Sequence, residues 1–244
     1  MTKIIFTIIF WVSSTLAFGQ EFQHGLILPE ETENEELCCI YSPRQGFSVY
    51  GKPGGSRIGT LTRYTEENKN FDSYYQIYFI DGKSGNAARI ALDDFQEIGY
   101  KIWAVTYFEK RNGFVRIIDE DYSYWLSERE IENHGFRLRE WQEFLSDNAG
   151  YLMGFYAKSP GLNLREGPDT DSNVIMALRG TTNQILPQKE HSGAWTKVKV
   201  ILLKEKPCET NLSEKNNIKE ELEGWIKIVD DYGKLNVWYY PRGC

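Results

Sequence analysis

The chain has 244 residues, with 28 basic and 35 acidic side chains that give a formal net charge of −7. This acidic balance argues against a nucleic-acid-binding protein, because such proteins gather positive charge to contact phosphates. The length allows one large or two small domains. Aromatic residues make up 14% of the chain, and many short segments alternate apolar and polar residues, which together favour small β-barrels.

Residues 1–19 have the pattern of a secretory signal peptide. Lys3 precedes a short apolar run, and the small-residue sequence Ala17-Phe-Gly19 lies just before Gln20. The apolar run is well short of the roughly 20 residues that a membrane-spanning helix needs, although an uncleaved membrane anchor is the alternative. We therefore expect cleavage near Gly19/Gln20, a secreted or periplasmic protein, and no membrane insertion of the mature chain.

The mature chain is expected to begin with a flexible acidic leader over residues 20–36, because five glutamates crowd into 30–36. A first domain is predicted at 37–126. Its opening strand contains Phe47 and Val49, and Gly54-Gly55 form the tip of the next turn. A hairpin around the turn at 81–85 is an insertion, and further strands are predicted at 103–108, 114–118 and 122–126.

Residues 127–150 are predicted to form a helical linker. Ser127 and Glu130 have the spacing of a capping box. A second helix is predicted over 137–145, where Leu138, Trp141, Phe144 and Leu145 share one face. That face is expected to pack between the two domains and set their orientation, and the alternative is a docking face for a partner.

A second domain is predicted over 151–244. Leu162 and Leu164 alternate with polar residues, Gly167-Pro-Asp169 form a turn, and later strands fall at 174–178, 183–187 and 195–203. A long insert, 204–223, is either a mobile loop, which we favour, or contains a short exposed helix. A terminal hairpin over 224–240 closes the domain.

Three signatures of this second domain resemble the bacterial SH3-like family. They are the L-N-L-R-E-G-P opening at 162–168, the Trp195-x-Lys197-Val198 strand and the Gly224-Trp225-Ile226 strand. The resemblance covers about 155–240, and the long insert departs from it. A fainter copy at 46–61 pairs Gly46 with Gly161, Val49 with Leu164, and Pro53 with Pro168. The resemblance implies a mainly β fold of two tandem SH3-like small β-barrels joined by a short helical linker.

Small barrels bind extended ligands across an aromatic-lined groove, which suggests a candidate ligand-binding set in each domain. In the second domain the set is Arg165, Glu166 and Asp169 opposite Trp195 and Trp225. In the first domain it is Tyr50 and Lys52 opposite Phe114 and Trp125. The alternative for the second domain is that its two tryptophans fill the barrel core and that Arg165 is a surface salt-bridge partner.

The four cysteines, at 38, 39, 208 and 244, are expected in an oxidising compartment. We predict a disulfide between Cys208 and Cys244, which would tether the insert to the chain end and stabilise the fold by roughly 3 to 4 kcal/mol. A bond between the adjacent Cys38 and Cys39 would be strained, so at least one of them is expected to be a small buried apolar residue.

Neither a metal site nor a cofactor is expected, because the cysteine spacings are not zinc motifs and His24, His134 and His191 are scattered along the chain. Bacterial SH3-like domains often accompany cell-wall cysteine peptidases, but Cys38-Cys39 lies in no D-C-S-G type motif. We therefore expect no enzyme. The sequence favours a binding module for cell-wall peptide or an extracytoplasmic protein. The alternatives are a cell-wall hydrolase or its inactive relative, and an architectural subunit of the cell envelope.

Overall fold

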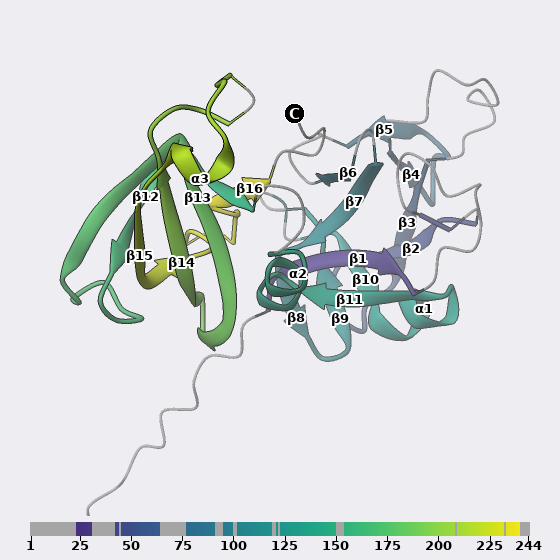
Figure 1. Cartoon of the computed structure of the whole chain (residues 1–244). Helices are drawn as coiled ribbons and strands as arrows, with labels where there is room; N and C mark the ends of the chain where they lie inside the picture. The colour runs from purple at the N-terminus through teal and green to yellow at the C-terminus, as the bar shows by residue number, and fades with distance from the viewer. Residues whose placement is uncertain are drawn as a thin grey trace, which may run out of the picture.

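The computed structural model describes residues 23–30, 42–43, 45–63, 77–90, 95–99, 102–118, 121, 123–149, 154–207, 209–231 and 233–239. These residues form a mainly β protein with several sheets, as predicted. Figure 1 shows two β-rich halves side by side, with helix α2 (Trp141–Asp147) between them. We call residues 23–149 the N-terminal half and 154–239 the C-terminal half. Among the described helices, none has the length and apolar character needed to span a membrane.

The N-terminal half contains two antiparallel sheets. The first has four strands in the order β11 (Phe136–Glu140), β1 (Gly25–Pro29), β7 (Ile102–Tyr107) and β6 (Phe95–Gly99). The second has seven strands in the order β5 (Ala87–Arg89), β4 (Tyr78–Asp81), β3 (Arg57–Thr62), β2 (Phe47–Tyr50), β10 (Trp125–Ser127), β9 (Phe114–Arg116) and β8 (Glu109–Arg111). One apolar cluster lies between them, with Phe47 and Val49 from one sheet and Ile27 and Val105 from the other.

Strand β1 corrects the prediction of a flexible leader over residues 20–36. Leu26 and Ile27 are fully buried, and β1 pairs with two strands at once. Ile27 lies opposite Leu138 of β11 and opposite Val105 of β7. The acidic residues that suggested a solvated leader begin only at Glu30, after the strand. The partners of this short apolar run lie far along the chain, so local composition gave no sign of them.

The predicted linker at 127–150 is also part of the N-terminal half. Helix α1 (Glu128–Asn133) begins after Ser127, but the Ser127 side chain makes no cap hydrogen bond, and the Glu130 carboxylate accepts instead from the Ser48 N–H at 2.7 Å. The predicted capping box is therefore wrong. The predicted helix over 137–145 starts only at Trp141, because residues 136–140 form β11 and pair with β1.

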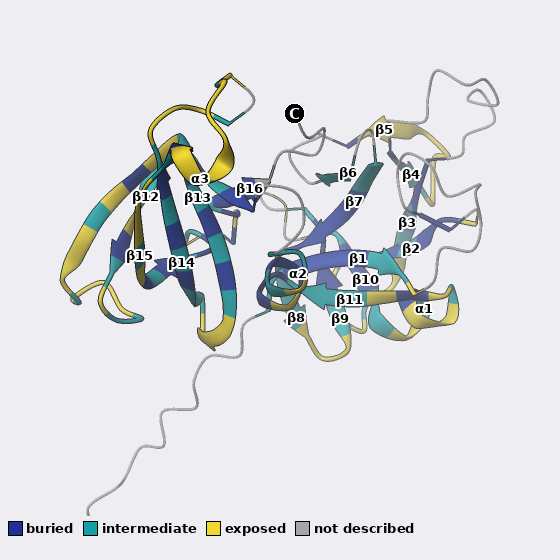
Figure 2. Ribbon diagram, viewed as in Figure 1, coloured by how far each residue is buried: buried dark blue, intermediate teal, exposed yellow. Residues whose placement is uncertain are grey.

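The C-terminal half is a closed sheet. Its strands are β12 (Phe155–Arg165), β13 (Val174–Ser192), β14 (Trp195–Leu203), β15 (Ile218–Lys227) and β16 (Val237–Tyr239), in the order β13-β14-β15-β12-β16. Since β12 also pairs with β13, the first four strands form a ring, and β16 is added to β12. Val198 and Val200 point into the ring, while their neighbours in β14 are half-buried, as the alternating colours in Figure 2 show.

The last part of the predicted insert at 204–223 is strand. Strand β15 starts at Ile218, and its residue Leu222 lies opposite Val200 of β14. The short helix α3 (Glu214–Asn217) precedes it, so the preference for a loop is wrong from 214 onward. Asn217 is buried and holds the remaining loop: its Oδ1 accepts from the Glu205 N–H at 2.9 Å, and its Nδ2 donates to the Glu205 carbonyl at 3.0 Å.

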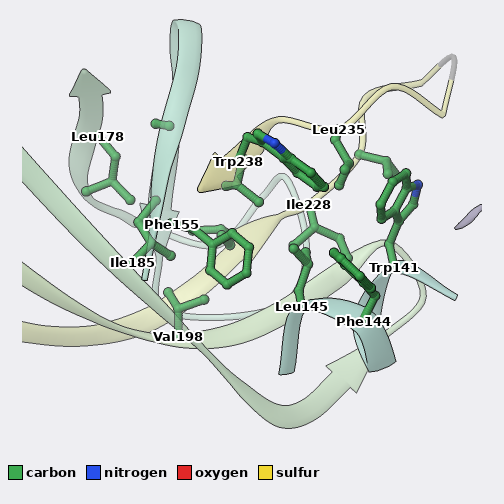
Figure 3. Packing of buried hydrophobic residues seen from close by; sticks show 14 of the residues in the cluster. Trp141, Phe144, Leu145, Phe155, Leu178, Ile185, Val198, Ile228, Leu235 and Trp238 are labelled. Carbon is green, nitrogen blue, oxygen red and sulfur yellow. The ribbon is translucent and has the colours of Figure 1, made fainter. Parts of the chain in front are cut away.

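Helix α2 joins the two halves, which confirms the predicted packing role for its apolar face. Trp141, Phe144 and Leu145 lie next to Ile228 and Trp238 (Figure 3). The cluster that contains them also includes Leu26 and Ala104 of the N-terminal half. The Trp141 and Trp238 rings meet edge to face at 5.9 Å, and Phe144 stacks on Trp238 at 6.0 Å. Leu138 departs from the predicted face, since it lies in β11 and packs against the N-terminal cluster.

Candidate functional site

The outer surface of the C-terminal ring carries two tryptophans and two lysines on adjacent strands. In β14, Thr196 and Val198 are fully buried, so the half-buried Trp195 and Lys197 point outward. In β15, the buried Ile226 lies between half-buried Trp225 and Lys227, which point outward by the same alternation. We call Trp195, Lys197, Trp225 and Lys227 the tryptophan–lysine block.

The strand register sets the pattern within this block. Trp195 lies opposite Lys227, and Lys197 lies opposite Trp225. Directly opposed side chains have Cβ atoms about 4.5 to 5.5 Å apart, so each indole has a lysine across the strand pair and another two residues along its own strand. Arg165 of β12 lies opposite Trp225 on its other side. A row of Arg165, Trp225 and Lys197 therefore crosses three strands.

Exposed carboxylates balance the two lysines of the block. The Lys197 Nζ lies 3.2 Å from both carboxylate oxygens of Glu190, and Lys227 pairs with Asp231. Lys227 lowers the pKa of the Asp231 carboxyl, through a hydrogen bond first and through its charge second. The side chains of Glu190 and Asp231 are 62% and 85% exposed, so these pairs contribute little stability. A ligand carboxylate can replace them at little cost.

The acidic residues predicted for this site stabilise the turn after β12. The Asp169 carboxylate accepts from the Ser172 N–H at 2.6 Å, from the Ser172 hydroxyl at 2.8 Å and from the Asp171 N–H at 2.9 Å. These hydrogen bonds, with Ser172 the largest contributor, hold the pKa of Asp169 below its usual range. Glu166 accepts from the Asn173 amide at 2.9 Å. Both acids are exposed, and their side chains bond their own loop.

The Arg165 guanidinium is anchored to the same loop. Its Nη1 donates to the Ser172 carbonyl at 2.7 Å, and its Cα lies opposite that of Trp225 in the sheet. The loop contacts use only part of the donor capacity of a guanidinium, which has five N–H groups. Arg165 is thus positioned by the loop and borders the tryptophan–lysine block.

The predicted set in the N-terminal half comes together only in part. The Tyr50 and Phe114 rings meet edge to face at 5.3 Å, and Trp125 lies opposite Tyr50 in the sheet. Trp125 is only 2% exposed, and the Arg111 guanidinium lies 5.0 Å from its ring centre. The prediction that Trp125 lines a groove is therefore wrong, because this ring belongs to the folded interior. Lys52 is exposed, in the turn between β2 and β3.

The alternative that Trp195 and Trp225 fill the core is wrong as well, and the lysines of the block were missed. The signal was the parity of the strands. Val198, Val200 and Ile226 are buried in the core and have even numbers. Since successive side chains of a strand point to opposite faces, the odd-numbered residues of β14 and β15 face outward; these are Trp195, Lys197, Trp225 and Lys227.

In the part of the chain that the structure describes, no group of three or more His, Cys, Asp or Glu side chains is placed to hold a metal ion. The four cysteines, and with them the predicted disulfide between Cys208 and Cys244, lie outside the described residues. Comparisons with protein families, with curated proteins and with solved structures found no match for this chain.

Proposed function

We propose that this chain is an exported, non-enzymatic binding protein whose C-terminal half is an SH3-like barrel that takes a carboxylate-bearing extended peptide on its tryptophan–lysine block. The ligand we propose first is cell-wall peptide. The observation that carries the proposal is the position of Trp225, half-exposed between Arg165 and Lys197 in one cross-strand row. The closed ring of β12 to β15 supports the SH3-like assignment of the C-terminal half.

The physical case rests on the combination of indole and cation. A half-exposed indole offers a large apolar surface that loses little conformational entropy on binding, and tryptophan and arginine are enriched where binding energy concentrates. The flanking Arg165 and Lys197 supply charge for carboxylates along the ligand, and the guanidinium suits a bidentate pair. Such a row can bind an extended chain that places an apolar group between two acidic ones.

A protein of the cell envelope is the second candidate ligand. Val174, at the start of β13, is 48% exposed and lies opposite Arg165, and its neighbour Ile175 is 39% exposed. These are two of the three large apolar side chains exposed among the described residues, and they extend the surface around the row. A binding or architectural role with a protein partner would use this apolar edge together with Trp225.

A retention experiment separates these ligands. Mature protein, residues 20–244, is mixed with intact sacculi and, separately, with envelope extract from which sacculi have been removed. We expect retention by sacculi that falls with Trp225→Ala and with Lys197→Gln. Leu212→Ala is the matched control, because Leu212 is an exposed apolar residue (39%) in the loop before β15. Retention by the extract alone would assign a protein partner, and retention by neither would refute the proposal.

A further inference from the structure

A small open pocket lies where the two halves meet, apart from the tryptophan–lysine block. Its volume is about 260 Å³. One wall is formed by Arg139 and by the polar side of α2, and the other wall by the end of β13. The lining residues are Arg139, Gln142, Glu143, Ser146, Asp147, Lys189 and His191. Pockets for drug-sized ligands span about 300 to 1,000 Å³, so this one suits a molecule of amino-acid or dipeptide size.

The two walls of the pocket carry opposite charge. On the helix side, one guanidinium, that of Arg139, is shared between the carboxylates of Glu143 and Asp147. That wall therefore has one negative charge in excess. On the strand side, Lys189 has no ion pair among the described residues and supplies a positive charge, beside the imidazole of His191. Glu190, between these two, pairs instead with Lys197 of the block.

Gln142 is the one buried residue among those that line the pocket, at 4% exposure, so it forms the pocket floor. Its Nε2 donates to the Gly193 carbonyl at 2.5 Å. Because a carbonyl only accepts, this bond fixes which end of the amide faces Gly193. The other end, Oε1, is buried and has no hydrogen-bond partner among the described residues. A buried acceptor without a donor is costly, so the Gln142 amide is held in place by its bond to Gly193 at the expense of its own carbonyl oxygen.

From this arrangement we propose that the pocket binds a small zwitterion, an amino acid or dipeptide with a free ammonium and a free carboxylate. The ligand carboxylate lies toward Lys189. The ligand ammonium lies toward Glu143 and Asp147, on the opposite wall. A bound molecule would contact α2 and β13 together, so its binding would also hold the two halves in one orientation.

The test uses alanylalanine as the probe and the mature protein in a calorimetric titration. Two capped probes remove one charge each: alanylalanine amide lacks the carboxylate, and N-acetyl-alanylalanine lacks the ammonium. We expect alanylalanine to bind and each capped probe to bind at least about tenfold more weakly, which corresponds to about 1.4 kcal/mol.

Two variants then locate each charge in the pocket. Lys189→Gln should weaken alanylalanine about tenfold but leave the affinity for the amide unchanged, because the amide has no carboxylate to lose contact with. Glu143→Gln should weaken alanylalanine and leave N-acetyl-alanylalanine unchanged. Lys215→Gln is the matched control, since Lys215 is an exposed lysine on α3, at the other end of the β14–β15 hairpin.

Several results would overturn the proposal. One is the absence of binding heat with alanylalanine at concentrations up to about 10 mM, well above a dissociation constant of about 1 mM. Equal affinity for the free and capped probes is another, as is equal weakening of every probe by Lys189→Gln. None of these results bears on the tryptophan–lysine block, which is tested separately with sacculi.

Discussion

Replacing Trp141 with alanine should weaken the junction between the two halves more than any other single truncation in α2. Trp141 is 1% exposed and contacts the rings of Phe144 at 6.1 Å and Trp238 at 5.9 Å (Figure 3). Truncating a buried tryptophan to alanine costs about 3 to 5 kcal/mol. Edge-to-face aromatic pairs add about 0.5 to 1.5 kcal/mol beyond their buried area, so the upper part of that range is expected.

Chemical denaturation measures the loss, and small-angle scattering measures the mutual mobility of the halves. Trp125→Ala is the matched control, because Trp125 is 2% exposed but belongs to the N-terminal half alone. Both variants should lose similar stability, and only Trp141→Ala should increase the radius of gyration. A loss below about 1 kcal/mol, or scattering that shows independent halves in the unmutated protein, would refute this account of the junction.

Three further predictions concern single groups. The hydroxyl of Tyr107 is buried with no partner among the described residues, so Tyr107→Phe should raise the free energy of unfolding by about 1 kcal/mol in a denaturant titration at pH 7. Burial raises the pKa of Tyr107 above the ordinary value of 10.0, so this phenol ionises more readily in the unfolded chain, and the free energy of unfolding falls as the pH rises above 10.0. Tyr107→Phe should remove that part of the alkaline destabilisation, and an unchanged profile would contradict it. The Ser172 N–H donates to the Asp169 carboxylate, whose pKa is lowered. In an NMR titration the chemical shift of the Ser172 amide proton should therefore change only below the ordinary aspartate pKa of about 3.9. In Asp169→Asn it should not change with pH. Mass spectrometry of non-reduced peptides should find Cys208 linked to Cys244, and a bond from Cys244 to any other cysteine would refute that pairing.

Sequence patterns predicted best where the pairing partners are close along the chain. The β14 strand and the turns at 54–55 and 81–85 were predicted from local alternation and from glycines. The turn at Asp169 was found in the same way, since its hydrogen bonds span only two or three residues. Such features depend on short-range chemistry that a single sequence displays.

The misses depend on contacts between distant segments. Leu26 and Ile27 became a buried strand because 102–107 and 136–140 pair with it on either side. Leu138 has helical spacing to Trp141, yet its backbone pairs with β1, and tertiary pairing overrides a short helical pattern. Part of the candidate site was predicted, because Arg165, Trp195 and Trp225 were identified from their residue types. Their outward orientation could be assigned only after the structure showed which residues of the ring are buried in its core.

The most direct test of the central claim is a binding isotherm of the mature protein on purified sacculi, measured for the unmutated chain and for Trp225→Ala. A tryptophan at the centre of a binding surface contributes about 2 kcal/mol or more, so we predict at least about thirtyfold weaker binding for Trp225→Ala. Binding by the unmutated chain should also weaken with added salt, because Arg165 and Lys197 supply charge. Equal isotherms for the two proteins, with both folded, would contradict the claim that this surface binds the ligand.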